Sequence, residues 1–390
     1  MPKSSPADRA SVLIAAVSGR ALAESARRAD INPLVADFFA DTDTRTIAQA
    51  CCKVTGNIKR GFTWEALERA FATLEAKAPS PIQGIVYGAG FEDRPQLLAR
   101  IAERWPLLGN DAATVERLKA PDSFFAALKQ LDIKHPRTTT SPPPSMAGWL
   151  RKRPGGAGGS HVKLAAKVAE ANDYYQEFVP GRAVSALFVG NGGGATVLGF
   201  SEQWTAPKQN APFRYAGAVR PAMLAAAIAD AMTSIVAELT AAFAIKGLAS
   251  ADFVVGETDP VLLEINPRPG ATLDIFDCGD LPLLRLHLES ILEQKLPDTL
   301  HKLKDAAASA IVYAPEAVCI GKDVIWPAWA LDRPSPGERI DKNRPICTVA
   351  ARASTLEGAK KLIAERISLI LAALGGNDNE HKNGCEELAR

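Results

Sequence analysis

The sequence predicts a chain of mixed α/β and α+β class, and two regions carry this prediction. Near the amino end, the apolar segments 11–17 and 34–37 flank an alanine-rich helical stretch, which is the pattern of a strand, a helix and a strand. Further on, the apolar segments 251–255 and 261–265 are joined by a short polar turn and predict an antiparallel hairpin. Strand and helix alternation favours a parallel sheet and hairpins favour an antiparallel one, so the chain needs both.

The first region predicts a small doubly wound domain at residues 1–108. Helices are expected around residues 44–52 and 64–74, before a strand over residues 84–90 that runs into a glycine turn. Gly88 and Gly90 invite a dinucleotide-binding interpretation. The third glycine and the helix-opening context of that fingerprint are missing, so NAD binding is disfavoured.

Composition limits the classes of function that remain. The 390 residues are 47% hydrophobic, enough for two or three packed domains. Lys plus Arg (45) nearly balances Asp plus Glu (44), and the basic residues do not gather in a stripe. Nucleic-acid binding therefore has little electrostatic support, and small-molecule substrates are expected instead.

Cysteine usage and apolar runs indicate a soluble, cytoplasmic protein without a membrane partner. No apolar run approaches the roughly 20 residues that span a bilayer. No CxxC spacing or nearby histidine indicates a zinc site, so the cysteines are expected to be reduced thiols. The six cysteines are Cys51, Cys52, Cys278, Cys319, Cys347 and Cys385. The five histidines also show no ligand spacing and are assigned no role.

A glycine-rich loop follows the extended connector at residues 138–144 and the predicted strand that contains Lys152. Glycine lets successive backbone N–H groups approach phosphate oxygens closely, so such a loop can cover a triphosphate. The loop comprises Gly155, Gly156, Ala157, Gly158 and Gly159. A P-loop is excluded because the lysine precedes the glycines. A mobile surface loop without a ligand is the alternative.

A second segment, residues 174–181, carries an acid at a predicted strand end beside aromatic and aliphatic side chains. The Glu177 carboxylate can accept a proton from an adenine amino group, while neighbouring backbone groups bond the ring edge. An ordinary solvent-facing strand residue explains Glu177 equally well, so this signal is weak alone.

The hairpin gives the strongest signal. Strand alternation places Glu264, Asn266 and Arg268 on one face, and Asp252 can lie beside them on the neighbouring strand. Two carboxylates and an amide are hard oxygen ligands suited to Mg²⁺, which completes its shell with phosphate oxygens and water. The arginine can hold a transferring phosphoryl group. A solvent-facing hairpin explains these residues poorly, because Pro267 and Pro269 enclose the end of an apolar strand.

Near the carboxyl end, strands are expected at residues 307–313 and 346–351, and a last helix at residues 356–374. The polar tail, residues 375–390, is predicted to be disordered because it is charged and rich in glycine and asparagine.

Together, these motifs in this order resemble the ATP-grasp superfamily over roughly residues 11–370, and in particular the predicted ATP-dependent carboligases related to biotin carboxylase and tyramine-glutamate ligase. The resemblance implies an ATP-grasp fold with a Rossmann-like pre-ATP-grasp domain at residues 1–108. It also implies an ATP-grasp A subdomain with the glycine flap at residues 109–172. The carboxy-terminal ATP-grasp subdomain, with adenine linker, metal site and small β segment, would occupy residues 173–370.

The resemblance also assigns roles residue by residue. Arg268 and Lys152 would be catalytic, and Asp252, Glu264 and Asn266 would bind the metal. The ATP-binding set would be Lys119, Lys152, Gly155, Gly156, Ala157, Gly158, Gly159, Glu177, Phe178 and Val179. Two departures bear on nucleotide affinity: Lys119 lies ahead of the expected position of a phosphate-binding lysine, and Arg182 and Ala183 replace an acid usual after the linker glycine. Arg214 and Gly270 are expected to contact substrate.

The activity implied by the resemblance is an ADP-forming carboxylate-amine ligase that uses ATP and Mg²⁺ or Mn²⁺ and forms an acyl phosphate. Its partners would be a small carboxylate and an amine, with a role in one-carbon cofactor biosynthesis of the methanofuran or tetrahydromethanopterin type. Two alternatives stay open: a bicarbonate-dependent carboxylating synthase of the purine branch, and a non-catalytic nucleotide-binding protein. A homodimer also stays open, since the apolar helical residues 222–243 suit either a core or a dimer contact.

Overall fold

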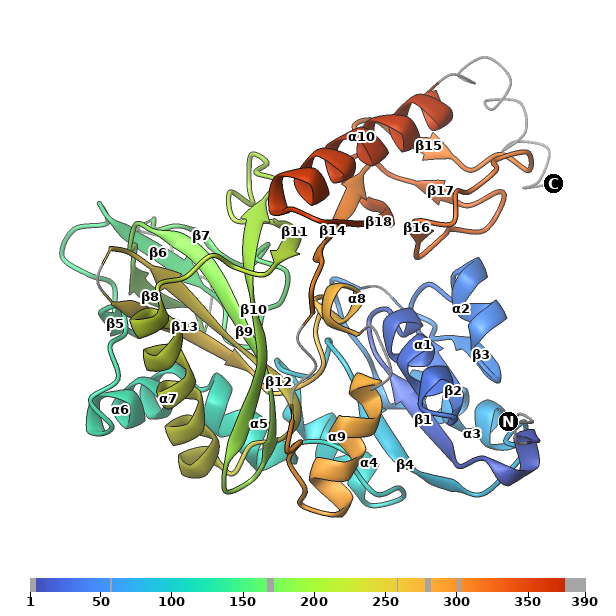
Figure 1. Cartoon of the computed structure of the whole chain (residues 1–390), viewed down its shortest axis with the longest axis horizontal. Helices are drawn as coiled ribbons and strands as arrows, with labels where there is room; N and C mark the ends of the chain where they lie inside the picture. The colour runs from blue at the N-terminus through green and yellow to red at the C-terminus, as the bar shows by residue number, and fades with distance from the viewer. Residues whose placement is uncertain are drawn as a thin grey trace.

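The computed structural model describes residues 5–56, 58–166, 172–257, 259–277, 282–299 and 303–375. The chain forms a small parallel sheet, a large antiparallel sheet, a third sheet that carries the glycine-rich loop, and a carboxy-terminal helix (Figure 1). Apart from Gly375, the predicted disordered tail lies outside the described residues. Cys278 and Cys385 also lie outside them.

The amino-terminal region forms the predicted parallel sheet, in the order β3-β2-β1-β4. Its strands are β1 (Ser11–Ala15), β2 (Asn32–Asp37), β3 (Ala50–Lys53) and β4 (Ile82–Tyr87). Every residue of β1 and β2 is buried, as expected for a parallel sheet covered on both faces. The surrounding helices are η1 (Pro6–Asp8), α1 (Arg20–Arg28), α2 (Thr42–Ile47), α3 (Trp64–Glu75) and α4 (Pro95–Ala102).

The helix expected over residues 44–52 is partly wrong. Helix α2 ends at Ile47, and residues 50–53 form β3, which pairs in parallel with β2 from Leu34 opposite Ala50 onward. Pairing with β2 satisfies the backbone of this short segment, and that tertiary contact overrides local helical preference.

The central sheet has eight strands in the order β13-β12-β9-β10-β11-β14-β18-β16, and all its pairings are antiparallel. The strands are β9 (Arg182–Asn191), β10 (Ala195–Thr205), β11 (Tyr215–Arg220), β12 (Lys246–Val255), β13 (Pro260–Asn266), β14 (Ala306–Tyr313), β16 (Ala330–Leu331) and β18 (Pro345–Ala353). The predicted hairpin is confirmed as β12 and β13. Helices α8 (Leu273–Phe276) and α9 (Leu283–Leu292) follow the hairpin, and α10 (Leu356–Gly375) packs on β14 and β18.

The third sheet, in the order β5-β8-β6-β7, carries the glycine-rich loop between β6 and β7. Its strands are β5 (Thr138–Thr139), β6 (Trp149–Lys152), β7 (Lys163–Leu164) and β8 (Tyr174–Glu177). Helices α5 (Ala112–Lys119) and α6 (Pro121–Gln130) precede this sheet, and a small ribbon pairs β15 (Val318–Cys319) with β17 (Arg339–Ile340). The segment expected to be a plain connector thus contributes one short strand, β5.

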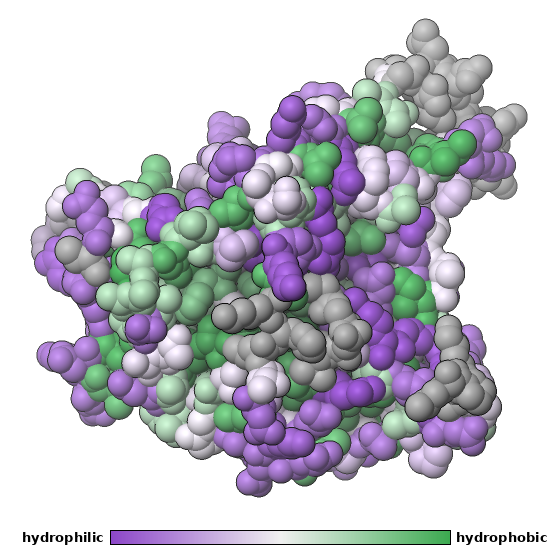
Figure 2. Space-filling view, in the orientation of Figure 1, coloured by the Kyte–Doolittle hydropathy of each residue, from purple (hydrophilic) through white to green (hydrophobic). Residues whose placement is uncertain are grey.

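Helix α7 (Ala226–Phe243) is, among the described residues, the one helix long and apolar enough to cross a membrane by length and composition alone. Five of its apolar side chains lie in the core formed with the central sheet: Ile228, Met232, Val236, Leu239 and Phe243. Hydrophobic side chains are more frequent on the left of the face in Figure 2, over the central sheet, than on the right, over α1. Packing against the sheet accounts for the apolar character of α7.

The prediction that all six cysteines are reduced is wrong for Cys319, which is disulfide-bonded. Cys51, Cys52 and Cys347 are free thiols, as predicted. Residue spacing alone did not indicate the disulfide, because bridged cysteines are brought together by the fold and not by sequence separation.

Candidate functional site

The hairpin of β12 and β13 brings together the three predicted metal ligands. Asp252 lies directly opposite Glu264 in the strand register, and Asn266 lies two residues further along β13. The Asn266 amide nitrogen donates to Asp252 Oδ2 at 2.9 Å, and the Ser185 hydroxyl donates to Asp252 Oδ1 at 2.6 Å. These contacts fix the orientation of the carboxylate and the amide before any ligand binds.

Lys119 joins the same cluster from the last residue of α5. Its ammonium donates to Glu264 Oε2 at 3.3 Å and to Asn266 Oδ1 at 3.0 Å. Sequence position placed Lys119 ahead of the expected lysine, but the fold brings it onto the predicted metal ligands. A positive charge therefore already lies between the Glu264 carboxylate and the Asn266 amide oxygen.

The two carboxylates differ in their electrostatic environment. Burial and the charge of Glu264 raise the pKa of Asp252, whose hydrogen bond from Ser185 only partly opposes the shift. Burial also acts to raise the pKa of Glu264, but the positive groups of Lys119, His161 and Lys152 outweigh it and lower the pKa. A divalent cation held between these groups would favour the ionised form of both carboxylates.

The described residues contain no group of three or more His, Cys, Asp or Glu that could hold a metal ion. Two carboxylates and one amide match the small number of protein ligands that Mg²⁺ takes when phosphate oxygens and water complete its octahedron. The donor set therefore fits a magnesium–phosphate complex, and it does not fit a closed structural metal site.

Lys152 projects from β6 toward the hairpin and is buried. Its ammonium donates to the Gln176 side-chain oxygen on β8. Burial lowers the pKa of Lys152, while the charges of Glu264 and Asp252 oppose that shift. The ammonium group of Lys152 therefore interacts electrostatically with two of the predicted metal ligands.

The glycine-rich loop is held against two other segments of the chain. Gly155 has a φ of +67°, and a Cβ there would lie 2.4 Å from the Glu92 carbonyl oxygen. Gly159 has a φ of +68°, and a Cβ there would lie 1.9 Å from the Phe213 carbonyl oxygen. The Tyr215 N–H donates to the Gly158 carbonyl at 3.0 Å. Only glycine permits this backbone conformation and close approach together.

A small cavity of about 20 Å³ lies between the loop and the hairpin. Its lining includes Gly155 and Gly156 from the loop, Lys119 from α5, and Glu264 from β13. That volume suits a single water molecule. The loop therefore lies closed over the polar cluster, and a larger ligand needs the loop to move.

Arg268 follows β13 and contacts the loop between β4 and α4 of the amino-terminal region. Its Nε donates to Glu92 Oε1 at 2.7 Å, and the other Glu92 oxygen accepts the backbone N–H groups of Gly90 and Phe91 at 2.8 and 3.0 Å. Both members of this ion pair are buried. At Gly270, a Cβ would lie 2.9 Å from Arg268 Nη1, so glycine there leaves room for the guanidinium.

Other predicted site residues lie away from this cluster. The Glu177 carboxylate accepts two hydrogen bonds from Arg137 at 2.9 Å each, at the surface. Phe178 is exposed, and neither it nor Val179 lines the cavity. Arg214 is buried, where its guanidinium donates to the carbonyls of Ala206 and Asn343. These contacts give Glu177 and Arg214 local structural partners, while their ligand roles stay predictions.

Two residues near the cluster, His161 and Glu92, were not identified from the sequence. His161 lines the cavity, and its Nδ1 is buried without a hydrogen-bond partner. Burial lowers its pKa, against the charge of Glu264. Glu92 holds Arg268, and the buried Tyr215 hydroxyl has no partner. The position of His161 two residues after the glycine run was the one available signal, and Glu92 gave none.

Comparisons with known proteins bear on the domain type and the fold of the chain. A model of the ATP-grasp domain matches residues 123–272. An uncharacterised protein of Methanocaldococcus jannaschii is 26% identical over 180 residues, which span 45% of this chain and 42% of that protein. The chain thus aligns with less than half the length of this relative.

Solved structures resemble almost the whole chain. The biotin carboxylase domain of Hydrogenobacter thermophilus 2-oxoglutarate carboxylase, solved with MgADP and bicarbonate, has a TM-score of 0.69 at 12% identity and covers 90% of this chain and 88% of its own. Thermotoga maritima N5-carboxyaminoimidazole ribonucleotide synthetase has a TM-score of 0.65 at 14% identity, and the match covers 92% of this chain and 98% of that one. Bacillus licheniformis L-amino acid ligase has a TM-score of 0.66 at 13% identity, and the match covers 92% of this chain and 96% of that one.

The fold is that of the ATP-grasp enzymes: a glycine-rich loop on one sheet faces an acidic hairpin on another, after an amino-terminal parallel-sheet region. Residues 123–272 thus match the ATP-grasp domain, and about nine tenths of the chain shares the fold of these solved structures.

Proposed function

We propose that the protein is an ATP- and magnesium-dependent ligase that joins a carboxylate to an amine with release of ADP. The observation that carries the proposal is the convergence of Asp252, Glu264, Asn266 and Lys119 beneath the glycine-rich loop. Hard oxygen ligands, a lysine ammonium and a flexible backbone cover together suit a magnesium-bound triphosphate.

Each residue has a defined task in this proposal. Asp252, Glu264 and Asn266 would hold Mg²⁺, which would supply positive charge to offset that of the triphosphate. Lys119 moves off Glu264 and Asn266 to bind a phosphate oxygen, and Lys152 binds a second one. The loop formed by Gly155, Gly156, Ala157, Gly158 and Gly159 covers the triphosphate. The adenine roles of Glu177, Phe178 and Val179 require the exposed end of β8 to close over the base.

The chemistry needs position and charge and no protein nucleophile. A carboxylate oxygen of the substrate attacks the γ-phosphorus, the bond from that phosphorus to the β–γ bridging oxygen breaks, and ADP leaves. The amine nitrogen then attacks the acyl carbon, phosphate leaves, and the nitrogen loses a proton. Arg268 stabilises the charge on the transferring group, and loop closure keeps water from the acyl phosphate.

The test of this proposal is ADP release from a panel of carboxylates and amines, with magnesium present or chelated. We expect ADP release to require both an acid and an amine, and to stop when magnesium is removed. Glutamate with a phenol- or furan-bearing amine is the first pair to try, in line with the predicted one-carbon cofactor pathway. Absence of ADP release across the whole panel would favour a nucleotide-binding protein without turnover.

The carboxylating alternative shares all of these residues, and fold similarity to N5-carboxyaminoimidazole ribonucleotide synthetase supports it as strongly as similarity to the amino acid ligase. Bicarbonate distinguishes the two activities. A ligase releases ADP in bicarbonate-free buffer, whereas a carboxylating synthase requires added bicarbonate. Gel filtration with light scattering would measure the oligomeric state, for which a homodimer stays a proposal.

Two neighbouring glycines provide a matched test of the loop. Gly158→Ala and Gly159→Ala both force alanine to positive φ, at a cost of about 1–3 kcal/mol each if the backbone does not relax. Only the Gly159 Cβ would meet the Phe213 carbonyl; at Gly158 nothing lies within 4 Å. We therefore expect Gly159→Ala to raise the KM for ATP about tenfold or more over Gly158→Ala. Equal KM values would contradict a role for docking of the loop on Phe213.

A further inference from the structure

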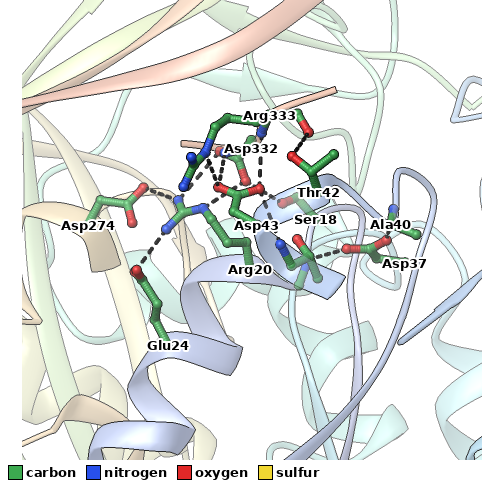
Figure 3. Close-up of polar contacts among 12 residues, drawn as sticks. Ser18, Arg20, Glu24, Asp37, Ala40, Thr42, Asp43, Asp274, Asp332 and Arg333 are labelled. Atoms are coloured by element: carbon green, nitrogen blue, oxygen red, sulfur yellow. Dashed lines mark hydrogen bonds and ion pairs between the residues drawn. The ribbon is translucent and has the colours of Figure 1, made fainter. Parts of the chain in front are cut away.

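A second polar site lies at the carboxyl ends of β1 and β2, apart from the β12–β13 hairpin. Parallel strands end at the same edge of a sheet, and ligands of open α/β sheets bind in the crevice beyond that edge. Beyond β1 lies Arg20, beyond β2 lie Asp41 and Asp43, and the carboxy-terminal segment contributes Asp332 and Arg333. Figure 3 shows Arg20, Asp43, Asp332 and Arg333 of this cluster.

Most acids of this cluster have partners. Arg20 is buried and donates to Asp332 at 3.0 Å and to Asp274 at 2.6 Å. Asp43 accepts the backbone N–H groups of Asp332 and Arg333 at 2.8 and 3.1 Å. Asp37 accepts the backbone N–H groups of Gly19, Phe39 and Ala40. These contacts account for the burial of Asp37, Asp43, Asp274 and Asp332.

Asp41 is different. Its side chain is 4% exposed, and none of the hydrogen bonds or ion pairs in the described part of the chain involves its carboxyl group. Burial and the carboxylates of Asp332, Asp37 and Asp43 raise its pKa to about 8. Burying an acid among other acids without a counter-ion is costly, and such positions occur preferentially at functional sites.

A second unpaired group lies one helical turn further along α2. The Thr44 hydroxyl is fully buried and has no hydrogen-bond partner. Residues three apart on a helix lie on adjacent parts of its surface, so Thr44 and Asp41 can serve one ligand. A cation bound beside Asp41 would favour the ionised form of its carboxyl group. The free oxygen atoms of both side chains can accept hydrogen bonds from a cationic N–H donor such as an ammonium group.

Tyr215 lies near acids of both this crevice and the β12–β13 hairpin. Its buried hydroxyl has no partner, and the charges of Asp274 and Asp252 both act on it. Asp274 belongs to the Arg20 cluster, and Asp252 belongs to the hairpin. A substrate extending from Asp41 past Arg20 and Tyr215 would therefore approach the site of acyl transfer.

We propose that Asp41, with Thr44, binds an ammonium group of the amine substrate. The proposal rests on the ligase function above and names its substrate class. The nitrogen that attacks the acyl phosphate must be uncharged, so the ammonium at Asp41 is a second group. The substrate is then an amine that carries a further cationic amino group at its far end.

Calorimetry tests the site without turnover. We expect the full chain to bind a member of the 1,3-diaminopropane to 1,6-diaminohexane series more tightly than the monoamine of equal length. Asp41→Asn should weaken diamine binding roughly 10- to 100-fold, because a charge-assisted hydrogen bond is lost. The exposed acid Asp323 provides the matched control, and Asp323→Asn should leave the affinity unchanged.

Asp41→Asn is expected to fold, because asparagine serves equally well at a helix N-cap and removes charge repulsion. Its Tm at pH 9, where the Asp41 carboxyl of the wild type is mostly ionised, should equal or exceed that of the wild type. Thr44→Val should weaken diamine binding less than Asp41→Asn and provides a second variant.

Several results would overturn the proposal. Equal diamine affinity in wild type and Asp41→Asn would do so, as would the absence of binding by every diamine in the series. Binding of Mg²⁺ or Ca²⁺ alone that disappears in Asp41→Asn would show a metal site instead. These measurements need no ADP release, so failure of the ligase assay and failure of this site are distinguishable.

Discussion

Replacing Arg268 with alanine should lower kcat roughly 100- to 1000-fold, the usual effect of losing one group that stabilises transition-state charge. The same change leaves Glu92 buried without its counter-ion and should cost about 3–5 kcal/mol of folding stability. Steady-state kinetics and thermal unfolding, measured on one preparation, report the two effects. ATP affinity should change little, because the proposed role of Arg268 is in the transition state.

The double variant Arg268→Ala with Glu92→Ala separates catalysis from stability. Removing both charges relieves the unpaired carboxylate, so much of the lost stability should return. Turnover should stay low, since no guanidinium is restored. Recovery of kcat in the double variant, or undiminished kcat in the single one, would refute the catalytic assignment of Arg268.

Glu264→Gln should abolish most activity by weakening magnesium binding. The amide retains the size of the side chain but loses the charge that offsets the cation, and several kcal/mol of transition-state stabilisation depend on the metal. We expect a higher magnesium concentration for half-maximal rate together with a lower kcat. ADP release measured across a magnesium titration checks this result.

The control for Glu264→Gln lies on the same hairpin. Glu257 is exposed in the turn between β12 and β13, so Glu257→Gln changes net charge equally without reaching the cluster. Its magnesium dependence should match that of the wild type. If both variants behave alike, the effect comes from overall charge, and Glu264 is not a metal ligand.

The elements with a clear local pattern could be predicted from the sequence. The hairpin was predicted because its two apolar segments, polar turn and alternating side chains all lie within residues 251–268. The pairing of Asp252 with Glu264 follows from that register. In contrast, β3 is a strand because β2 lies beside it, and nothing within residues 50–53 indicates that neighbour.

Contacts between distant segments explain what the sequence did not reveal. Glu92 and Arg268 are 176 positions apart, and Lys119 and Glu264 are 145 apart. Asp41 is recognisable only once the fold brings four other carboxylates near it. An isolated acid or histidine is common in any chain, so only the three-dimensional arrangement of these residues distinguishes them.

The glycine-rich loop contacts two regions that the chain reaches at very different points. Gly155 abuts the backbone at Glu92, and Gly159 abuts the backbone at Phe213. The loop therefore contacts both the amino-terminal region and the segment before β11, so opening the loop requires both contacts to break. We expect release of ADP to be the rate-limiting step of turnover, because ADP can leave only when the loop opens.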